Sequence, residues 1–211
     1  ALQLHQKGRF NKEQYMFKRK LLIGALASVA ACSSFAEDSD LSYTYVGVAY
    51  QTGEIVDEDF AGFGIGGSAA INDSIFVLGQ YSSLISDDEF DVGFGAGDIE
   101  VTQFNFGIGF HTPMANNVDF VASLSYVDAE IEYLGVTVDG NGYLLSLGVR
   151  GKPTDVLELS AAINYADIED EGEAGYGASA RFFAAPKISI GLGYGSADDV
   201  DTISLDLRFD I

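Results

Sequence analysis

Residues 202–211 constrain the fold most, because apolar and polar residues alternate strictly along this stretch. A two-residue period places all apolar side chains on one face of a β-strand and all polar side chains on the other. About ten residues with one apolar face is the length that a tilted transmembrane strand requires. The stretch therefore predicts a membrane-spanning strand, with the apolar face formed by Ile203, Leu205, Leu207, Phe209 and Ile211.

The N-terminal region has the pattern of a secretory leader. Residues 16–20 form a basic segment, residues 21–32 an apolar run, and residues 34–36 a small-x-small cleavage pattern. An apolar run of about a dozen residues is too short for a helix that spans a bilayer, and it is typical of a signal peptide. We expect residues 1–15 to be non-native upstream sequence, residues 16–36 to be a signal peptide cleaved after Ala36, and residues 37–211 to be the mature domain.

Cys32 is the single cysteine, so no disulfide forms within the chain. Residues 29–32 resemble a lipoprotein cleavage box, in which Cys32 would carry the lipid. The alternative is that Cys32 closes the apolar run of the leader and is removed with it.

The charge balance argues against a nucleic-acid partner. Six of the eleven Lys and Arg residues, but only one of the 32 acidic residues, precede residue 37. The expected mature domain thus keeps five basic and 31 acidic residues. Nucleic-acid binding requires basic patches that neutralise phosphates, and this domain has none.

Alternating stretches recur along the whole mature domain, and no stretch has a helical period. We expect an all-β fold, a transmembrane antiparallel up-and-down barrel of ten strands, with eight strands as the alternative. Turns after even-numbered strands are short and loops after odd-numbered strands are long and acidic, which fits periplasmic turns and extracellular loops. Residues 129–140 are expected to form a loop or a hairpin extension around Gly135. The ten strands are residues 41–51, 60–71, 74–82, 99–111, 118–128, 141–151, 156–166, 175–184, 187–195 and 202–211.

The aromatic residues decide which face meets the membrane. A soluble barrel would place its large apolar residues inside, but here the opposite face is rich in glycine and serine. Tyrosines gather at the loop ends of the strands and phenylalanines near the turn ends, as two lipid–water interfaces would select. The predicted aromatic girdles consist of Tyr81, Tyr126, Tyr143, Tyr165, Tyr176 and Tyr194, and of Phe110, Phe120, Phe182 and Phe209.

With its leader, strand pattern and C-terminal strand, the chain resembles the OmpA/OmpX-type small outer-membrane β-barrels of Gram-negative bacteria. The resemblance covers residues 41–211 and implies a cell outer-membrane location, contact with lipid and lipopolysaccharide, and insertion by the barrel-assembly machinery. Members usually end in Phe, whereas here Phe209 is followed by Asp210 and Ile211. The roles known in this group range over structural support, adhesion, small pores and a few enzymes.

Charged residues are predicted to close the lumen near the periplasmic turns. Arg150 and Glu158 face each other across the turn at Lys152, and Arg181 lies on the strand at the other side of Glu158. Charges in a narrow lumen are costly unless they are paired, so we expect a balanced network that plugs the barrel. The alternative is a wet lumen with separately solvated charges. The network comprises Arg150, Glu158, Arg181, Asp206, Arg208 and Asp210.

The long loops carry many acidic residues and no Lys or Arg. Crowded carboxylates are expected to attract Ca²⁺ or Mg²⁺, and through these ions lipopolysaccharide phosphates. The alternative is a solvated acidic surface without bound metal. Asp167, Glu169 and Glu171 begin like a calcium loop and are weak metal candidates, because Ala178 stands where such a loop needs a glutamate.

Little in the mature domain suggests catalysis. His111 is its single histidine and is expected at a strand end beside a turn, while outer-membrane enzymes place such residues near the opposite rim. We therefore expect no catalytic site and no cofactor. The leading hypothesis is a non-catalytic barrel with a structural or surface-interaction role; a small passive diffusion channel and an outer-membrane enzyme are the alternatives.

Overall fold

The computed structural model describes residues 41–55, 58–87, 90–91, 96–169, 171–198 and 200–211. The expected leader, including Cys32, lies outside these residues. No helix within the described part is long and apolar enough to cross a membrane.

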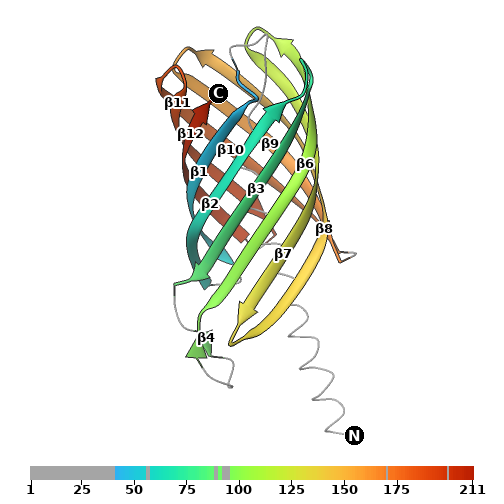
Figure 1. Ribbon diagram of the computed structural model, residues 1–211, viewed down its shortest axis with the longest axis vertical. Coiled ribbons are helices and arrows are strands. Elements are labelled where there is room, and N and C mark those ends of the chain that lie inside the picture. The colour runs from blue at the N-terminus through green and yellow to red at the C-terminus, as the bar shows by residue number, and fades with distance from the viewer. Residues whose placement is uncertain (1–40, 56–57, 88–89, 92–95, 170, 199) are drawn as a thin grey trace, which may run out of the picture.

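Ten strands close into an antiparallel barrel in which each strand pairs with its neighbour in sequence and β1 pairs with β12 (Figure 1). The expected fold and the number of ten strands are confirmed. Two short strands, β4 (Phe90–Asp91) and β5 (Ala96–Gly97), pair with each other outside the barrel. The barrel strands are β1 (Tyr45–Ile55), β2 (Glu58–Ala70), β3 (Ile75–Ser86), β6 (Ile99–Ala115), β7 (Val118–Tyr133), β8 (Val136–Thr154), β9 (Leu157–Ile168), β10 (Glu171–Ala185), β11 (Ile188–Ala197) and β12 (Val200–Asp210).

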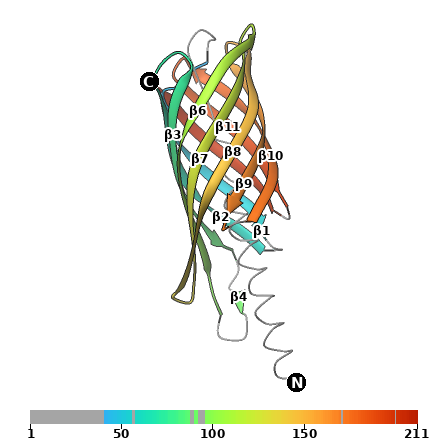
Figure 2. The ribbon, with the colours of Figure 1, turned by 90° about the vertical axis from the view of Figure 1, so that its right-hand side faces the viewer.

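The two ends of the barrel differ, as Figures 1 and 2 show. At one end, here called the turn end, short turns join β2 to β3, β6 to β7, β8 to β9 and β10 to β11, and the C-terminus lies beside them. At the other end, here called the loop end, the β7–β8 hairpin extends beyond the neighbouring barrel strands. The strand lengths agree with this extension of the β7–β8 hairpin, because β7 and β8 have 16 and 19 residues whereas β11 has 10.

Much of what the sequence suggested to be loop is strand. Residues 129–140 belong to β7 and β8, which are joined by a turn at Leu134 and Gly135. The residues of this hairpin alternate between acidic and apolar, as Asp128, Glu130 and Glu132 do with their neighbours, so the two-residue period continues beyond the expected strand end. Residues 167–174 likewise lie mostly in β9 and β10. The alternative of a hairpin extension around Gly135 is therefore the correct one.

Alternation separates the lumen from the outer surface along every strand. In β12, Ile203, Leu205 and Leu207 are about half exposed, while the residues between them are buried inside the barrel. The facing of β1, which the sequence left ambiguous, places Val46 and Tyr50 outside. The outer surface is thus the apolar band that a bilayer solvates, and the inward residues of β12 are polar except near its loop end.

The first strand begins at Tyr45 rather than at residue 41. Leu41 and Tyr43 precede it and are buried, with 3% and 2% of their surface exposed. These residues therefore fill the turn end of the lumen instead of extending the barrel wall.

Candidate functional site

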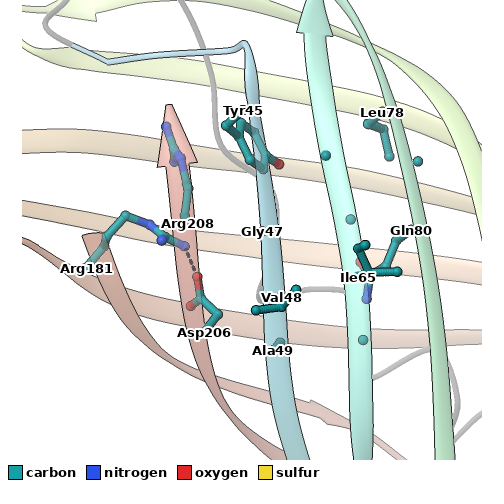
Figure 3. A pocket seen from close by; sticks show the side chains of 14 residues that line it. Tyr45, Gly47, Val48, Ala49, Ile65, Leu78, Gln80, Arg181, Asp206 and Arg208 are labelled. Atoms are coloured by element: carbon teal, nitrogen blue, oxygen red, sulfur yellow. Dashed lines mark ion pairs between the residues drawn. The ribbon is translucent and has the colours of Figure 1, made fainter. Parts of the chain in front are cut away.

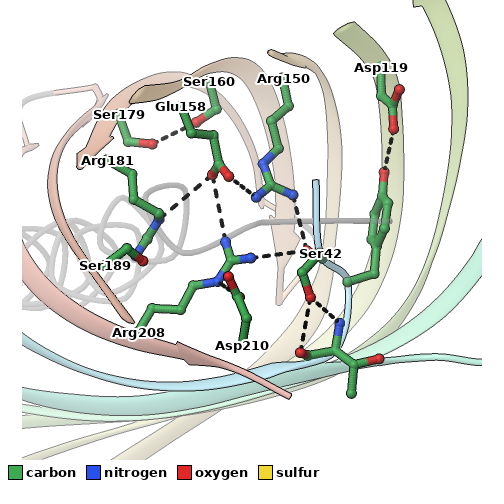
Figure 4. A network of polar contacts seen from close by, with 12 residues as sticks. Ser42, Asp119, Arg150, Glu158, Ser160, Ser179, Arg181, Ser189, Arg208 and Asp210 are labelled. Carbon is green, nitrogen blue, oxygen red and sulfur yellow. Dashed lines mark hydrogen bonds and ion pairs between the residues drawn. The ribbon is translucent and has the colours of Figure 1, made fainter. Parts of the chain in front are cut away.

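The six charged residues expected in the lumen all lie there and are brought together at the turn end (Figure 4). They come from the adjacent strands β8, β9 and β10 and from β12, which β11 separates from β10, and they point inward by alternation. Each is buried, and Arg150 and Arg208 retain only 1% exposure. We call this set the turn-end network.

Glu158 lies at the centre of the turn-end network. It accepts a hydrogen bond from Arg150 Nη2, and its other oxygen, Oε1, lies 3.7 Å from Arg181 Nε and 3.6 Å from Arg208 Nη1. Arg181 is its direct cross-strand partner on β10. One carboxylate therefore lies among three guanidinium groups, whereas the sequence suggested two.

The remaining two carboxylates each neutralise a different arginine. Asp206 Oδ1 lies 2.6 Å from Arg181 Nη2, and Asp210 Oδ1 accepts a hydrogen bond of 2.5 Å from Arg208 Nε. Of the two aspartates on β12, Asp210 thus pairs with Arg208 of its own strand, whereas Asp206 pairs with Arg181 on β10. Three arginines and three carboxylates form alternating contacts, which is the arrangement that lowers the cost of burying charge.

The segment before β1 completes the network. The backbone carbonyl of Ser42 accepts hydrogen bonds from Arg150 Nη1 at 3.3 Å and from Arg208 Nη2 at 3.0 Å (Figure 4). Sequence reasoning missed this contribution, because a backbone acceptor has no side-chain signal and residue 42 was expected in the barrel wall.

A second buried group at the turn end, consisting of Tyr43, His111 and Asp119, was also missed. The Tyr43 hydroxyl donates to Asp119 Oδ2 at 3.3 Å, and His111 Nδ1 lies 3.5 Å from the same oxygen. The Tyr43 and His111 rings stack with centroids 3.9 Å apart. Tyr43 lies before the first strand. Burial raises the pKa of its hydroxyl, which therefore stays protonated and donates the hydrogen bond.

His111 was expected at the rim touching a turn, and its backbone N–H does donate to Ser74 of the β2–β3 turn. Its side chain, however, points into the lumen and is 1% exposed. Phe76 reaches the same place because Gly109 has no side chain; a Cβ at Gly109 would lie 1.8 Å from the Phe76 ring. The histidine thus packs among Tyr43, Phe76 and Asp119 and presents no surface to a substrate.

The loop end of the lumen is filled by an apolar cluster, which was not expected. Phe60 is fully buried, and the exposed fraction of each of the other members is 6% or less. A signal was present, since the inward positions of these segments change from glycine and serine to larger apolar residues. This loop-end cluster comprises Ile55, Phe60, Leu84, Ile99, Val101, Val127, Ala129, Ile131, Leu144, Ala166, Ile168 and Val200.

Between the two ends the lumen is narrow. A cavity of about 40 Å³ lies beside Arg181, Asp206 and Arg208, and backbone of β1, β2 and β3 forms its opposite wall, rich in glycine (Figure 3). The ring of Tyr45 borders it and lies 4.3 Å from the Arg208 guanidinium carbon. A cavity of this size has room for a few water molecules.

The lumen is packed most tightly at its two ends. Phe60 is 0% exposed at the loop end, and Arg208 is 1% exposed at the turn end. Between them Gln51 is 1% exposed, but the inward residues Ser146, Ser160 and Asn164 retain partial exposure. Side chains therefore close the two ends of the lumen, and some space remains between them.

The residues of the predicted aromatic girdles lie on the outer surface. Tyr126 and Tyr143 are direct cross-strand partners, and their ring centroids are 6.2 Å apart; the rings of Tyr176 and Tyr194 lie at the same separation. Tyr81 and Tyr165 are also about half exposed. On the phenylalanine side, Phe110, Phe182 and Phe209 are about half exposed and Phe120 is partly exposed.

The structure describes the side chains of two of the three weak metal candidates. Asp167 and Glu169 are exposed near the tip of the β9–β10 hairpin, and the Glu171 side chain lies outside the described part. Glu169 Oε1 accepts a hydrogen bond of 3.5 Å from the backbone N–H of Asn141. Among the described residues no group of three or more His, Cys, Asp or Glu side chains could hold a metal ion.

Several solved structures are similar to this chain in fold. The NanC porin superposes with a TM-score of 0.51 at 7% identity, over 78% of this chain and all of that chain. The KdgM porin in complex with disordered oligogalacturonate gives a TM-score of 0.49 at 6% identity, over 79% of this chain and 99% of that one. The translocator domain of the autotransporter NalP from Neisseria meningitidis gives 0.47 at 11% identity, over 97% and 98%. No curated protein sequence matches the chain.

The family model described as "Outer membrane protein beta-barrel domain" matches residues 22–209, which is most of the chain. This match agrees with the closed ten-stranded barrel and its apolar outer face. It also supports a location in the outer membrane. The chain belongs to the family of outer-membrane β-barrel proteins.

Proposed function

We propose that this protein is a non-conducting, non-catalytic outer-membrane barrel that displays acidic hairpins at the cell surface. The observation that carries the proposal is the closure of the lumen at both ends. Phe60 at the loop end and Arg150 and Arg208 at the turn end are 0–1% exposed, which supports a lumen without a continuous water path from end to end. A barrel closed in this way serves through its outer surfaces rather than through transport.

The absence of catalysis rests on the position of the single histidine of the mature domain. His111 is 1% exposed and stacks on Tyr43, so a substrate cannot reach it without unpacking the turn end. The acidic residues of the loop end, in contrast, are exposed, among them Glu54, Asp128 and Asp201. Solvated carboxylates on rigid hairpins are suited to interaction with other surfaces.

The test is a planar-bilayer recording of the refolded protein. We expect no stable single-channel current, with a refolded open porin as the positive control for insertion. A reproducible ohmic current that scales with salt concentration would instead support the diffusion channel. The similarity to the NanC porin concerns the fold alone, and the recording tests whether this protein conducts.

A further inference from the structure

Strand β8 extends beyond its neighbour β9 at the loop end. It pairs with β7 along its length from Val136 onward, but its pairing with β9 begins only at Gly142, opposite Ile168. From Val136 to Gly140, no described strand pairs with the side of β8 that faces away from β7. In Figure 2 this hairpin projects past the rest of the barrel wall.

The backbone groups at this edge can be assigned from the hairpin geometry. Leu134 and Gly135 have φ values of 49° and 74°, which defines a two-residue turn whose flanking residues Tyr133 and Val136 form a hydrogen-bonded pair. Hydrogen-bonded and non-hydrogen-bonded pairs alternate along an antiparallel ladder, so the N–H and C=O groups of Thr137 and Asp139 point away from β7.

Asn141 provides an internal check of this assignment. It is the next residue in the same alternation, and its C=O accepts from the backbone N–H of Glu169 while its N–H donates to Glu169 Oε1. The outward groups of Asn141 are thus satisfied by the β9–β10 turn. Thr137 and Asp139 offer the same pair of groups to an incoming strand.

The charge around the open edge of β8 indicates which kind of segment binds there. Exposed acidic side chains line the outer face of the hairpin, namely Asp128, Glu130 and Glu132 on β7 and Asp139 on β8. Of the five basic residues that follow residue 36, four lie in the turn-end half of their strands and Lys187 lies in the β10–β11 turn, so none offsets this charge. A second copy of this chain would bring like charges together, whereas a segment rich in Lys or Arg would be attracted.

We propose that the open edge of β8 at residues 136–140 is a docking site for an extended basic segment of another protein. The segment adds as a strand, with backbone hydrogen bonds to Thr137 and Asp139 and with basic side chains over the acidic outer face. This deepens the proposed surface-interaction function and rests on it. Conduction and docking are measured separately, so either can fail alone.

The experiment uses the full chain refolded in nanodiscs without lipopolysaccharide and a short fluorescent peptide that alternates lysine and valine. Fluorescence anisotropy should show binding that weakens as salt is added, because exposed charge pairs are screened. Thr137→Pro and Asp139→Pro each remove one outward N–H without removing a bond to β7. Each should weaken binding about tenfold, the equivalent of roughly one hydrogen bond.

Two controls separate the edge from charge alone. Asp139→Asn keeps the backbone donor and should weaken binding less than Asp139→Pro. Glu54→Gln removes a charge on β1, five strands from β8 in either direction around the barrel, and should leave binding unchanged. Equal binding by a peptide that alternates glutamate and valine, or full affinity in both proline variants with an intact heat-stable fold, would overturn the proposal.

Discussion

Apolar side chains fill the loop end of the lumen, whereas ion pairs fill the turn end, and the two fillings respond differently to substitution. In the loop-end cluster each residue contributes mainly its buried area, which is non-directional, so a neighbour can partly relax into the space that a lost side chain leaves. In the turn-end network each charge depends on a partner of opposite sign. Loss of one charge leaves another buried without compensation, and the surrounding packing cannot correct that.

The largest effect is expected from Glu158→Gln. This change removes the carboxylate that three arginines share, so Arg150, Arg181 and Arg208 are left close together with one negative charge fewer. We expect the free energy of unfolding to fall by about 3–5 kcal/mol, the usual cost of breaking a buried ion pair. The measurement is the temperature at which the folded gel band converts to the unfolded band.

Asp210→Asn is the matched control, since Asp210 is paired with Arg208 alone in the described contacts of the network. Its conversion temperature should fall less than that of Glu158→Gln. Equal conversion temperatures for wild type and Glu158→Gln would show that the charges are separately solvated.

At the loop end, Phe60→Ala should lower the free energy of unfolding by about 3 kcal/mol, the lower part of the range for a buried aromatic residue. Phe63→Ala is the control on the same strand, because Phe63 faces outward and is 69% exposed. The outward variant should change the conversion temperature less. Since Phe60 and Glu158 lie at opposite ends of the lumen, the double variant should show nearly additive losses. Strong coupling between the two substitutions would show that the two ends of the lumen do not contribute independently to stability.

The turn-end network could be predicted from the sequence because short turns preserve the register between strands. Once Ile203 and its neighbours define the outer face of β12, Asp206 and Arg208 must point inward. The short turn then brings Arg150 near Glu158; it lies at Asp155 and Val156, just after the expected position at Lys152. The pairing of Asp206 with Arg181 on β10 could not be predicted, because β11 lies between their strands and the distances depend on barrel tilt and curvature.

The loop-end cluster could not be predicted because segments rich in acidic residues indicated loops rather than strands. In β7, Asp128 and Glu130 are the outward residues of a continuing strand, and Val127, Ala129 and Ile131 are its inward residues. The segment before β1 was missed for a different reason. Leu41 and Tyr43 also alternate with polar residues, so they fit a strand equally well. Tyr43 lies in the lumen through contacts with Phe76, His111 and Asp119, which are distant in sequence.

Tyr43→Phe tests the smaller of the two turn-end groups. The substitution removes the hydroxyl that donates to Asp119 but keeps the ring that packs on His111 and Phe76. A loss of about 1 kcal/mol in the free energy of unfolding is expected, the usual net value of one hydrogen bond. Tyr43→Ala should lose more, because the ring contacts disappear as well. If both variants convert at the wild-type temperature, residues 41–44 do not stabilise the barrel.

The smallest effect, and one of opposite sign, is expected from Glu130→Gln. Glu130 lies directly opposite Asp139 in the β7–β8 hairpin, and both side chains are exposed. Like charges in directly opposed positions destabilise a strand pair, so removing one should raise the conversion temperature slightly at low salt. The gain should disappear at high salt, because exposed charges are screened. The same exchange of a carboxylate for an amide thus stabilises the hairpin at the loop end and destabilises the lumen at the turn end. A fall in conversion temperature, or a gain that persists at high salt, would mean that Glu130 makes a favourable contact in the folded hairpin.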